Sequence, residues 1–122
     1  METILLVEDS DGVRDIARRV LERQGYRVLE APSAGAALEL SRNFSGNIDL
    51  LLTDVVMPEM SGRVLSETFA KQYPDAKVLF MSGYTDDAVV RHGVLQAETP
   101  YLQKPFSPHA LAGRVRELLD AP

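Results

Sequence analysis

Five short apolar runs alternate with segments of helical spacing along the chain. The runs cover residues 4–7, 26–29, 50–53, 78–81 and 100–102. The first, third and fourth are apolar throughout instead of alternating, which is typical of parallel strands covered on both faces. Because a helical segment follows each run, the order favours right-handed crossovers and helices on both faces of one sheet. We therefore predict an α/β fold with a five-stranded parallel sheet.

The segment after the first run is the clearest helix. Its apolar residues recur at i, i+3, i+4, i+7 and i+8, and they are Val13, Ile16, Ala17, Val20 and Leu21. Ser10 or Asp11 can cap its start, and Gly25 tolerates the left-handed conformation that ends many helices. We expect the opposite face to be solvated, and the alternative is a docking surface for a partner. That face carries Arg14, Arg18, Arg19 and Arg23.

Further helices are predicted over residues 33–44, 61–72 and 86–95, and from Ser107 to Leu119. Pro108 suits the first turn of the last helix, because proline lacks an N–H that a helix start would leave unpaired. In the helix over 61–72 we expect one apolar side. Its members are Val64, Leu65, Thr68 and Phe69.

The length of 122 residues suits one domain and is too short for two independent cores. We expect a single domain over residues 1–122, with its core over 3–119 and a tail at 120–122. The 13 Lys and Arg residues against 18 Asp and Glu give a net charge of −5. That sign disfavours direct binding to nucleic acid or to an anionic membrane surface.

The chain has no cysteine, which excludes disulfides, thiolate zinc sites and thiol nucleophiles and fits a cytoplasmic protein. No apolar run approaches the ~20 residues of a membrane span, and no basic segment precedes the first run. We therefore expect a cytoplasmic location without membrane contact.

Polar residues stand where the predicted strands end. Glu8 and Asp9 follow the first run, Asp54 the third and Ser82 the fourth, and Lys104 lies just beyond the fifth. In a parallel sheet these ends share one edge, where open α/β folds bind their ligands. Any one of these residues could be an ordinary loop residue. The combination of three carboxylates, a hydroxyl and an amine predicts a site.

Three carboxylates packed together repel each other and need a cation to stay ionised. With few protein oxygens and no histidine in the cluster, Mg²⁺ with several retained waters is favoured over Ca²⁺ or zinc. A phosphate oxygen would complete its shell, and Lys104 adds a second positive charge. Together these groups predict a site that stabilises transferred phosphoryl charge and offers a carboxylate as the nucleophile.

Four motifs lie at these strand ends. They are Leu6-Val7-Glu8-Asp9, Leu52-Thr53-Asp54-Val55-Val56-Met57-Pro58 with Ser61-Gly62, Met81-Ser82-Gly83, and Lys104-Pro105-Phe106. In order and spacing they resemble the receiver domain of two-component response regulators, and the resemblance extends from Ile4 to Leu119. It implies a flavodoxin-like (βα)5 doubly wound fold and a function in a phosphorelay.

The resemblance also implies the chemistry. Asp54 matches the phosphoacceptor, which attacks a phosphohistidine and becomes an acyl phosphate. Asp9 and Asp54 would bind Mg²⁺ directly, together with the backbone carbonyl of Val56, and Glu8 would act through a water. Lys104 would pair with the phosphoryl group.

A conformational switch is implied by the same resemblance. Ser82 matches the hydroxyl that binds a phosphoryl oxygen, and Tyr101 matches the aromatic residue that turns inward as Ser82 moves toward the phosphate. The peptide bond between Lys104 and Pro105 is expected to be cis.

Several positions depart from the commonest form of the family. Ser82 replaces the more frequent Thr and lacks a methyl group that shapes the switch. Val56 and Tyr84 occupy positions that influence attack of water on the acyl phosphate. Because both are bulky and Val56 cannot position a water, we predict slow self-dephosphorylation. The segment 96–99 replaces the small turn usual before the last strand.

The partners implied are a sensor histidine kinase, in cis or in trans, or a histidine phosphotransfer protein. No output domain follows the last predicted helix, so we expect a stand-alone regulator or a receiver of a larger protein. The opening residues and the last motif look most like the C-terminal receiver of a hybrid histidine kinase. We expect a monomer that could dimerise on phosphorylation.

Two other functions stay open. A receiver-like interaction module that is not phosphorylated would not need the five polar residues at the strand ends, so their presence argues against it. A Mg²⁺-dependent phosphohydrolase with an aspartyl nucleophile usually carries a second acid two residues after the nucleophile, where this chain has Val56. Enzyme activity beyond the domain's own phosphorylation and dephosphorylation is left open.

Overall fold

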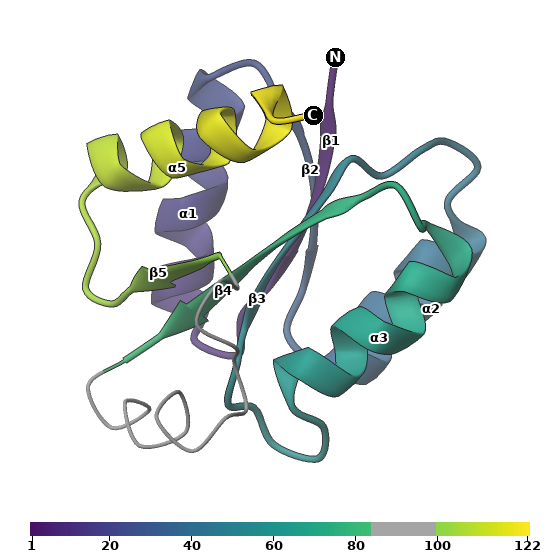
Figure 1. The fold of residues 1–122 in the computed structure, drawn as a ribbon. Coiled ribbons are helices and arrows are strands. Elements are labelled where there is room, and N and C mark those ends of the chain that lie inside the picture. Colours follow the sequence, from purple (N-terminus) through teal and green to yellow (C-terminus); the bar gives the residue numbers. More distant parts are fainter. Residues whose placement is uncertain (84–99) are drawn as a thin grey trace.

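The computed structural model of the protein describes residues 1–83 and 100–122. This part of the chain contains the strands β1 Thr3–Val7, β2 Arg27–Ala31, β3 Leu50–Asp54, β4 Lys77–Ser82 and β5 Tyr101–Gln103. They form one parallel sheet in the order β2-β1-β3-β4-β5 (Figure 1). The chain leaves β1 toward β2 and then crosses to β3 on the other side of β1. The strand order therefore reverses between β1 and β3, which is where open α/β sheets bind ligands.

The same described residues contain the helices α1 Asp11–Arg23, α2 Ala34–Asn43, α3 Gly62–Gln72 and α5 Pro108–Asp120. Helices α1 and α5 cover one face of the sheet, and α2 and α3 cover the other (Figure 1). The predicted parallel sheet with helices on both faces is confirmed. The helix predicted over 86–95 lies outside the described residues. Among those described, no helix is both long and apolar enough to cross a membrane.

A serine caps the start of each of these four helices. The side chains of Ser10, Ser33, Ser61 and Ser107 each accept a hydrogen bond from the backbone N–H three residues later, at 3.4, 3.2, 3.2 and 3.0 Å. Ser33 and Ser61 therefore precede the helices that they were expected to begin. Gly25, beyond the end of α1, has a φ of +95°, which is the left-handed conformation predicted for it.

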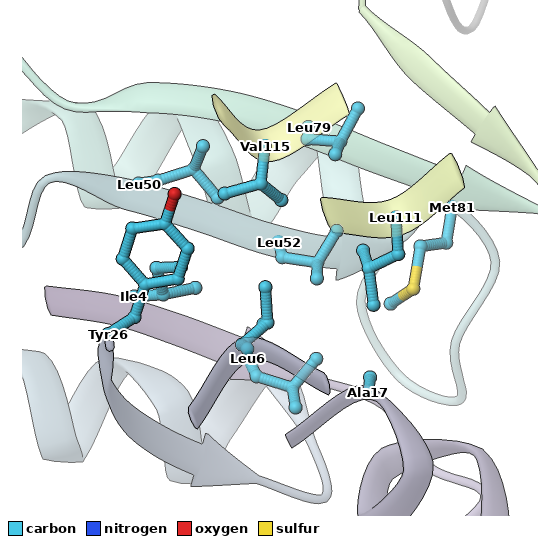
Figure 2. Packing of buried hydrophobic residues seen from close by; sticks show 11 residues of the cluster. Ile4, Leu6, Ala17, Tyr26, Leu50, Leu52, Leu79, Met81, Leu111 and Val115 are labelled. Atoms are coloured by element: carbon cyan, nitrogen blue, oxygen red, sulfur yellow. The ribbon is translucent and has the colours of Figure 1, made fainter. Parts of the chain in front are cut away.

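Two apolar cores, one on each face, explain why the central runs do not alternate. The core under α1 and α5 contains Ile4, Leu6, Leu50, Leu52, Leu79 and Met81 together with Ala17, Leu21, Leu111 and Val115 (Figure 2). The intervening strand residues Leu5, Val7 and Leu51 belong to the core under α2 and α3. Since successive side chains of a strand point to opposite faces, every residue of β1 and β3 is buried.

Three expected core positions are wrong. Ile16 on α1 is 56% exposed and Val64 on α3 is 47% exposed, and Thr68 is also exposed. Each helix packs on the sheet through the row one residue further on, which is Ala17 with Leu21 in α1 and Leu65 with Phe69 in α3. One residue is a turn of about 100° around a helix, so Ile16 and Val64 lie at the edge of the packed face, although Val20 still contacts the core.

The expected tail at 120–122 is one residue too long. Helix α5 continues through Asp120, whose carboxylate accepts a hydrogen bond from Arg116 at 2.8 Å, four residues earlier. The same guanidinium contacts Glu2 and the hydroxyl of Tyr26, at 2.8 and 3.2 Å. Pairs at i and i+4 stabilise the last turn of a helix, and here the pair also ties that turn to the start of β1.

Candidate functional site

The strand register brings the predicted polar residues to one edge of the sheet. Val7 of β1 lies beside Thr53 of β3, so the residues that follow them, Glu8 and Asp54, end neighbouring strands. Ser82 ends β4 and pairs with Gln103 of β5, which directly precedes Lys104. The backbone N–H of Lys104 donates to the carbonyl of Ser82 at 2.7 Å.

Three carboxylates cluster at this edge, as the sequence predicted. Ligand oxygens of Glu8, Asp9 and Asp54 lie within 4.8 Å of one another. Glu8 and Asp54 are only 1% and 4% exposed, whereas Asp9 is exposed. Oxygens at this separation can share one small cation, and a hard divalent ion such as Mg²⁺ prefers carboxylate ligands.

Lys104 bridges the two buried carboxylates. Its Nζ lies 2.5 Å from Asp54 Oδ1 and 2.8 Å from Glu8 Oε2. Among the described residues, Glu8 Oε2 has no hydrogen bond of good geometry, so the contact with Lys104 is an ion pair without an aligned hydrogen bond. The Lys104–Pro105 peptide bond is cis, as expected.

The charges of this trio do not balance. Burial, followed by the neighbouring Glu8 carboxylate, raises the pKa of Asp54 to about 8, and Lys104 only partly opposes this. Burial also works against ionised Glu8, yet its contacts with Asp54 and Lys104 and the hydrogen bond from the Ser10 amide leave its pKa below the usual value. One ammonium therefore cannot keep both carboxylates ionised at neutral pH. A second cation at the site would keep both of them ionised. The donor set thus fits a divalent metal ion.

Ser82 carries a buried hydroxyl beside this cluster. The residue is 0% exposed, and its Oγ has no hydrogen-bond partner among the residues described. Leaving a buried hydroxyl unpaired costs about 1–3 kcal/mol. A ligand oxygen at the site would remove that cost.

Two other predicted site residues are largely exposed. The side chain of Tyr101, the first residue of β5, is 43% exposed, and Val56 in the loop after β3 is 49% exposed. Tyr84 lies outside the described residues, so its contribution to slow dephosphorylation stays a prediction. The role of the Val56 carbonyl as a metal ligand also stays a prediction.

Gly62 shapes the site through the backbone. A Cβ atom at this position would lie 1.9 Å from the carbonyl oxygen of Asp54, and the Gly62 N–H donates to the carbonyl of Val55 at 2.8 Å. The start of α3 therefore closes directly over the end of β3. Gly62 belongs to one of the motifs in the sequence, but its close approach to Asp54 could not be read from the sequence.

The sequence did not predict the contact between Arg14 and the loop that carries Glu8. Arg14 was expected on a solvated face of α1, but its side chain is only 15% exposed and its Nη1 donates to the carbonyl of Glu8 at 2.8 Å. The one feature of the sequence that could have indicated this contact is the position of Arg14, one helical turn after the acidic loop.

An apolar hollow lies next to Lys104. It has a volume of about 370 Å³ and is lined by Val13, Ile16, Gly83, Lys104, Pro105 and Phe106. The exposed Ile16 thus stands over a hollow and not over the sheet. The hollow adjoins the acidic edge, so a partner bound there would be close to Asp54.

Among known protein families, the response regulator receiver domain matches residues 4–116 of this chain. This chain belongs to the response regulator receiver family. It is therefore a receiver domain of two-component signalling.

Two curated relatives contain a similar receiver. Sensor kinase CckA of Brucella abortus (strain 2308) is 45% identical over 118 residues, which are 97% of this chain and 12% of that protein. Transcriptional regulatory protein YvrH of Bacillus subtilis (strain 168) is 36% identical over 115 residues, which are 93% of this chain and 47% of that protein. The receiver thus spans less than half the length of either relative.

Solved structures of receivers share the fold. The receiver domain from the hybrid histidine kinase CckA has a TM-score of 0.74 and 37% identity, covering 97% of this chain and 99% of that one. The chemotaxis protein CheY4 of Vibrio cholerae has a TM-score of 0.82 and 27% identity, covering 97% and 98%. The flavodoxin-like arrangement expected from the sequence is confirmed.

Proposed function

We propose that this receiver accepts a phosphoryl group on Asp54 from a phosphohistidine. A carboxylate oxygen of Asp54 attacks the phosphorus in line, the new P–O bond forms as the P–N bond breaks, and the imidazole leaves with the electron pair. The observation that carries the proposal is the nearly buried Asp54, which is paired with Lys104. The Ser82 hydroxyl at the end of the neighbouring strand has no hydrogen-bond partner among the described residues.

Mg²⁺ fits the acidic edge as the cofactor. We assign Asp9, Asp54 and the Val56 carbonyl as its direct ligands and Glu8 as a ligand through water. The bound ion would supply positive charge next to the transferring phosphoryl oxygens. The support lies in the clustered carboxylate oxygens and in the raised pKa of Asp54, which a second cation would lower.

The protein's own groups would stabilise the product. The Lys104 ammonium, already 2.5 Å from Asp54, would pair with a phosphoryl oxygen, and the Ser82 hydroxyl would donate to another. Tyr101, now exposed, would turn inward as Ser82 moves. Because the phosphoryl group contacts Ser82 and Lys104 together only in one conformation, it would shift the population toward that conformation.

The donor would be a histidine kinase or a histidine phosphotransfer protein. The donor must bring its phosphohistidine to Asp54, and the apolar hollow beside Lys104 offers a contact surface there. We propose that residues 1–122 act as one receiver unit toward this donor.

The mass of the intact protein after incubation with acetyl phosphate tests the proposal. We expect a gain of one phosphoryl group that requires Mg²⁺ and is lost in Asp54→Asn. Asp75→Asn, which removes an exposed carboxylate in the turn before β4, is the matched control. This variant should be phosphorylated like the wild type. No gain with acetyl phosphate or with a phosphorylated histidine donor would favour the unphosphorylated interaction module instead.

A further inference from the structure

The loop between β1 and α1 consists of Glu8, Asp9 and Ser10, and Arg14 holds it at both ends. The backbone N–H of Arg14 donates to the carbonyl of Ser10 at 2.9 Å. Its side-chain Nη1 reaches back and donates to the carbonyl of Glu8 at 2.8 Å. Asp9, the exposed member of the acidic cluster, lies between these two anchor points.

The guanidinium of Arg14 is itself fixed on both sides. Its Nη2 donates to Asp11 Oδ1 at 2.7 Å in the first turn of α1, and its Nε donates to Glu30 Oε1 at 3.3 Å on β2. A planar guanidinium can hold three acceptors at once because its donors are arranged in a rigid fork. Arg14 thus joins the end of β1, the start of α1 and β2 at a single point.

Among the described residues, the hydrogen bonds of the loop give the Glu8 carbonyl one donor, which is Arg14. The Glu8 N–H donates to the carbonyl of Ala31 at 3.2 Å, and the Ser10 N–H donates to Glu8 Oε1 at 3.1 Å. The Glu8 carbonyl belongs to the peptide that leads into Asp9. Its orientation therefore sets where the Asp9 backbone, and with it the carboxylate, is placed.

We infer that Arg14 is a positioning residue for the divalent cation, acting through the loop that carries Glu8 and Asp9. The inference rests on the proposed function, since it presupposes that the acidic edge binds a cation. Without the guanidinium, the Glu8–Asp9 peptide can rotate, and Asp9 loses its fixed distance to Glu8 and Asp54. Partners that orient metal ligands typically change metal affinity by 10–100-fold when they are removed.

Arg18 provides a matched control. It lies one turn further along α1, carries the same charge and contacts the same Glu30, at 2.9 Å. Its other ion pairs are with Asp15 and Glu22 on α1 itself. Arg14→Gln and Arg18→Gln therefore remove the same charge from the same helix and the same pairing with Glu30, but only the first removes the contact to the loop.

The test is Mn²⁺ affinity, measured as free Mn²⁺ by electron paramagnetic resonance, with Mn²⁺ as the probe for the Mg²⁺ site. We expect Arg14→Gln to bind Mn²⁺ ~10-fold more weakly than the wild type, and Arg18→Gln to stay within about twofold of it. Arg14→Lys, which keeps the charge but loses the fork, should fall between them. Thermal unfolding of each variant reports stability separately, and both glutamine variants should lose a similar amount.

The outcomes separate the two proposals. If the wild type binds Mn²⁺ and both Arg14 variants bind it equally well, the positioning role is wrong while the cation site stands. An equal loss in Arg18→Gln would also overturn the role, because a general effect of charge or stability would then explain it. A wild type that binds no Mn²⁺ would overturn the cation site and the inference together.

Discussion

Among single residues, Glu8, Asp54 and Lys104 form the charged centre of the acidic edge. Two nearly buried carboxylates contact one ammonium, at 2.8 and 2.5 Å, and the exposed Asp9 adds a third negative charge at the rim. An unbalanced buried charge destabilises a folded protein unless a proton or a cation neutralises it. Without a bound cation, the site therefore lowers the free energy of unfolding by an amount that can be measured.

We predict that Asp54→Asn raises the free energy of unfolding of the Mg²⁺-free protein at pH 7.5, by on the order of 1–3 kcal/mol. The pKa of Asp54 is raised from 3.8 to about 8 in the folded state. Between these values the folded state keeps a proton that the unfolded state releases, so stability falls as the pH rises. The gain from asparagine should thus shrink as the pH approaches 4.

Urea unfolding at several pH values, without and with Mg²⁺, measures this difference. Asp75→Asn, which removes an exposed carboxylate, should show no such pH dependence. A loss of stability in Asp54→Asn at pH 7.5, equal to that at pH 4.5, would contradict the charge imbalance.

Ser82→Ala should not destabilise the unphosphorylated receiver. The Ser82 hydroxyl is buried without a described partner, so its removal should be neutral or raise the free energy of unfolding by up to about 1 kcal/mol. Ser41→Ala is the matched control, because this equally buried hydroxyl donates to the carbonyl of Leu38 at 2.9 Å and its loss should cost about 1 kcal/mol.

The same pair of variants tests the role of Ser82 in the phosphorylated state. Acetyl phosphate with Mg²⁺ should stabilise the wild type and Ser41→Ala by equal amounts and Ser82→Ala by less, as read from thermal unfolding. Equal stabilisation of all three would mean that Ser82 does not contact the phosphoryl group.

The residues of the acidic edge could be predicted from sequence because strand ends of a parallel sheet share one edge. That rule placed Glu8, Asp54 and Lys104 together without any knowledge of strand order. Arg14 could not be predicted in the same way. Its helical spacing indicates which face of α1 it occupies, but the bond to the Glu8 carbonyl depends on how the β1–α1 loop turns.

The contact of α3 with the end of β3 fixes the loop between these elements. The Gly62 N–H donates to Val55, and the Gly62 Cα packs against the Asp54 carbonyl too closely for a side chain. The backbones of β3, the loop and α3 therefore pack closely at Asp54, the residue proposed to carry the phosphoryl group.

Gly62→Ala should consequently lower the free energy of unfolding by about 2–4 kcal/mol, because a Cβ 1.9 Å from a carbonyl oxygen forces α3 and β3 apart. Gly113→Ala, in the middle of α5 with nothing within 4 Å of the new Cβ, should instead raise it by up to about 1 kcal/mol. Urea unfolding compares the two. Equal effects of both changes would show that the close approach is not a constraint.

Helices and strands were predictable as elements, whereas their contact faces were only partly so. Helical spacing identified α1 and α3, but it gave each a wider buried stripe than the helix uses. The helical periodicity indicates which residues share an apolar face. It does not indicate whether the sheet or a surface hollow lies under a given residue. Ile16 and Val64 have the same pattern in sequence, and only Ile16 lines the hollow.

In the molecule as a whole, the sheet brings the acidic edge and the apolar hollow to the same end. The reversal of strand order between β1 and β3 places Asp54 there, and Lys104 borders both features. The layers followed from the alternation of strands and helices, since helices must cover both faces of a buried parallel sheet, whereas the doubly wound topology was expected only from the family resemblance. The surface that meets a partner did not follow from alternation, because it is set by the side chains left exposed.

Ile16→Ser should slow phosphotransfer from a phosphorylated histidine protein, ~10-fold, while leaving phosphorylation by acetyl phosphate unchanged. The reason is that removing an exposed apolar side chain from a contact surface weakens docking but leaves the chemistry intact. Val64→Ser, which removes a similarly exposed side chain on the opposite face of the sheet, should affect neither reaction. Rates of transfer measured with radiolabelled donor decide this, and equal slowing by both variants would contradict a specific surface.

The most direct test of the proposed chemistry is to locate the phosphoryl group. Reduction of an aspartyl phosphate with borohydride converts that residue to homoserine, which peptide mass spectrometry can place in the sequence. We predict homoserine at position 54 after incubation with phosphodonor and Mg²⁺, and none when Mg²⁺ is omitted. Phosphorylation that leaves position 54 as aspartate, or homoserine at Asp9 instead, would contradict the account.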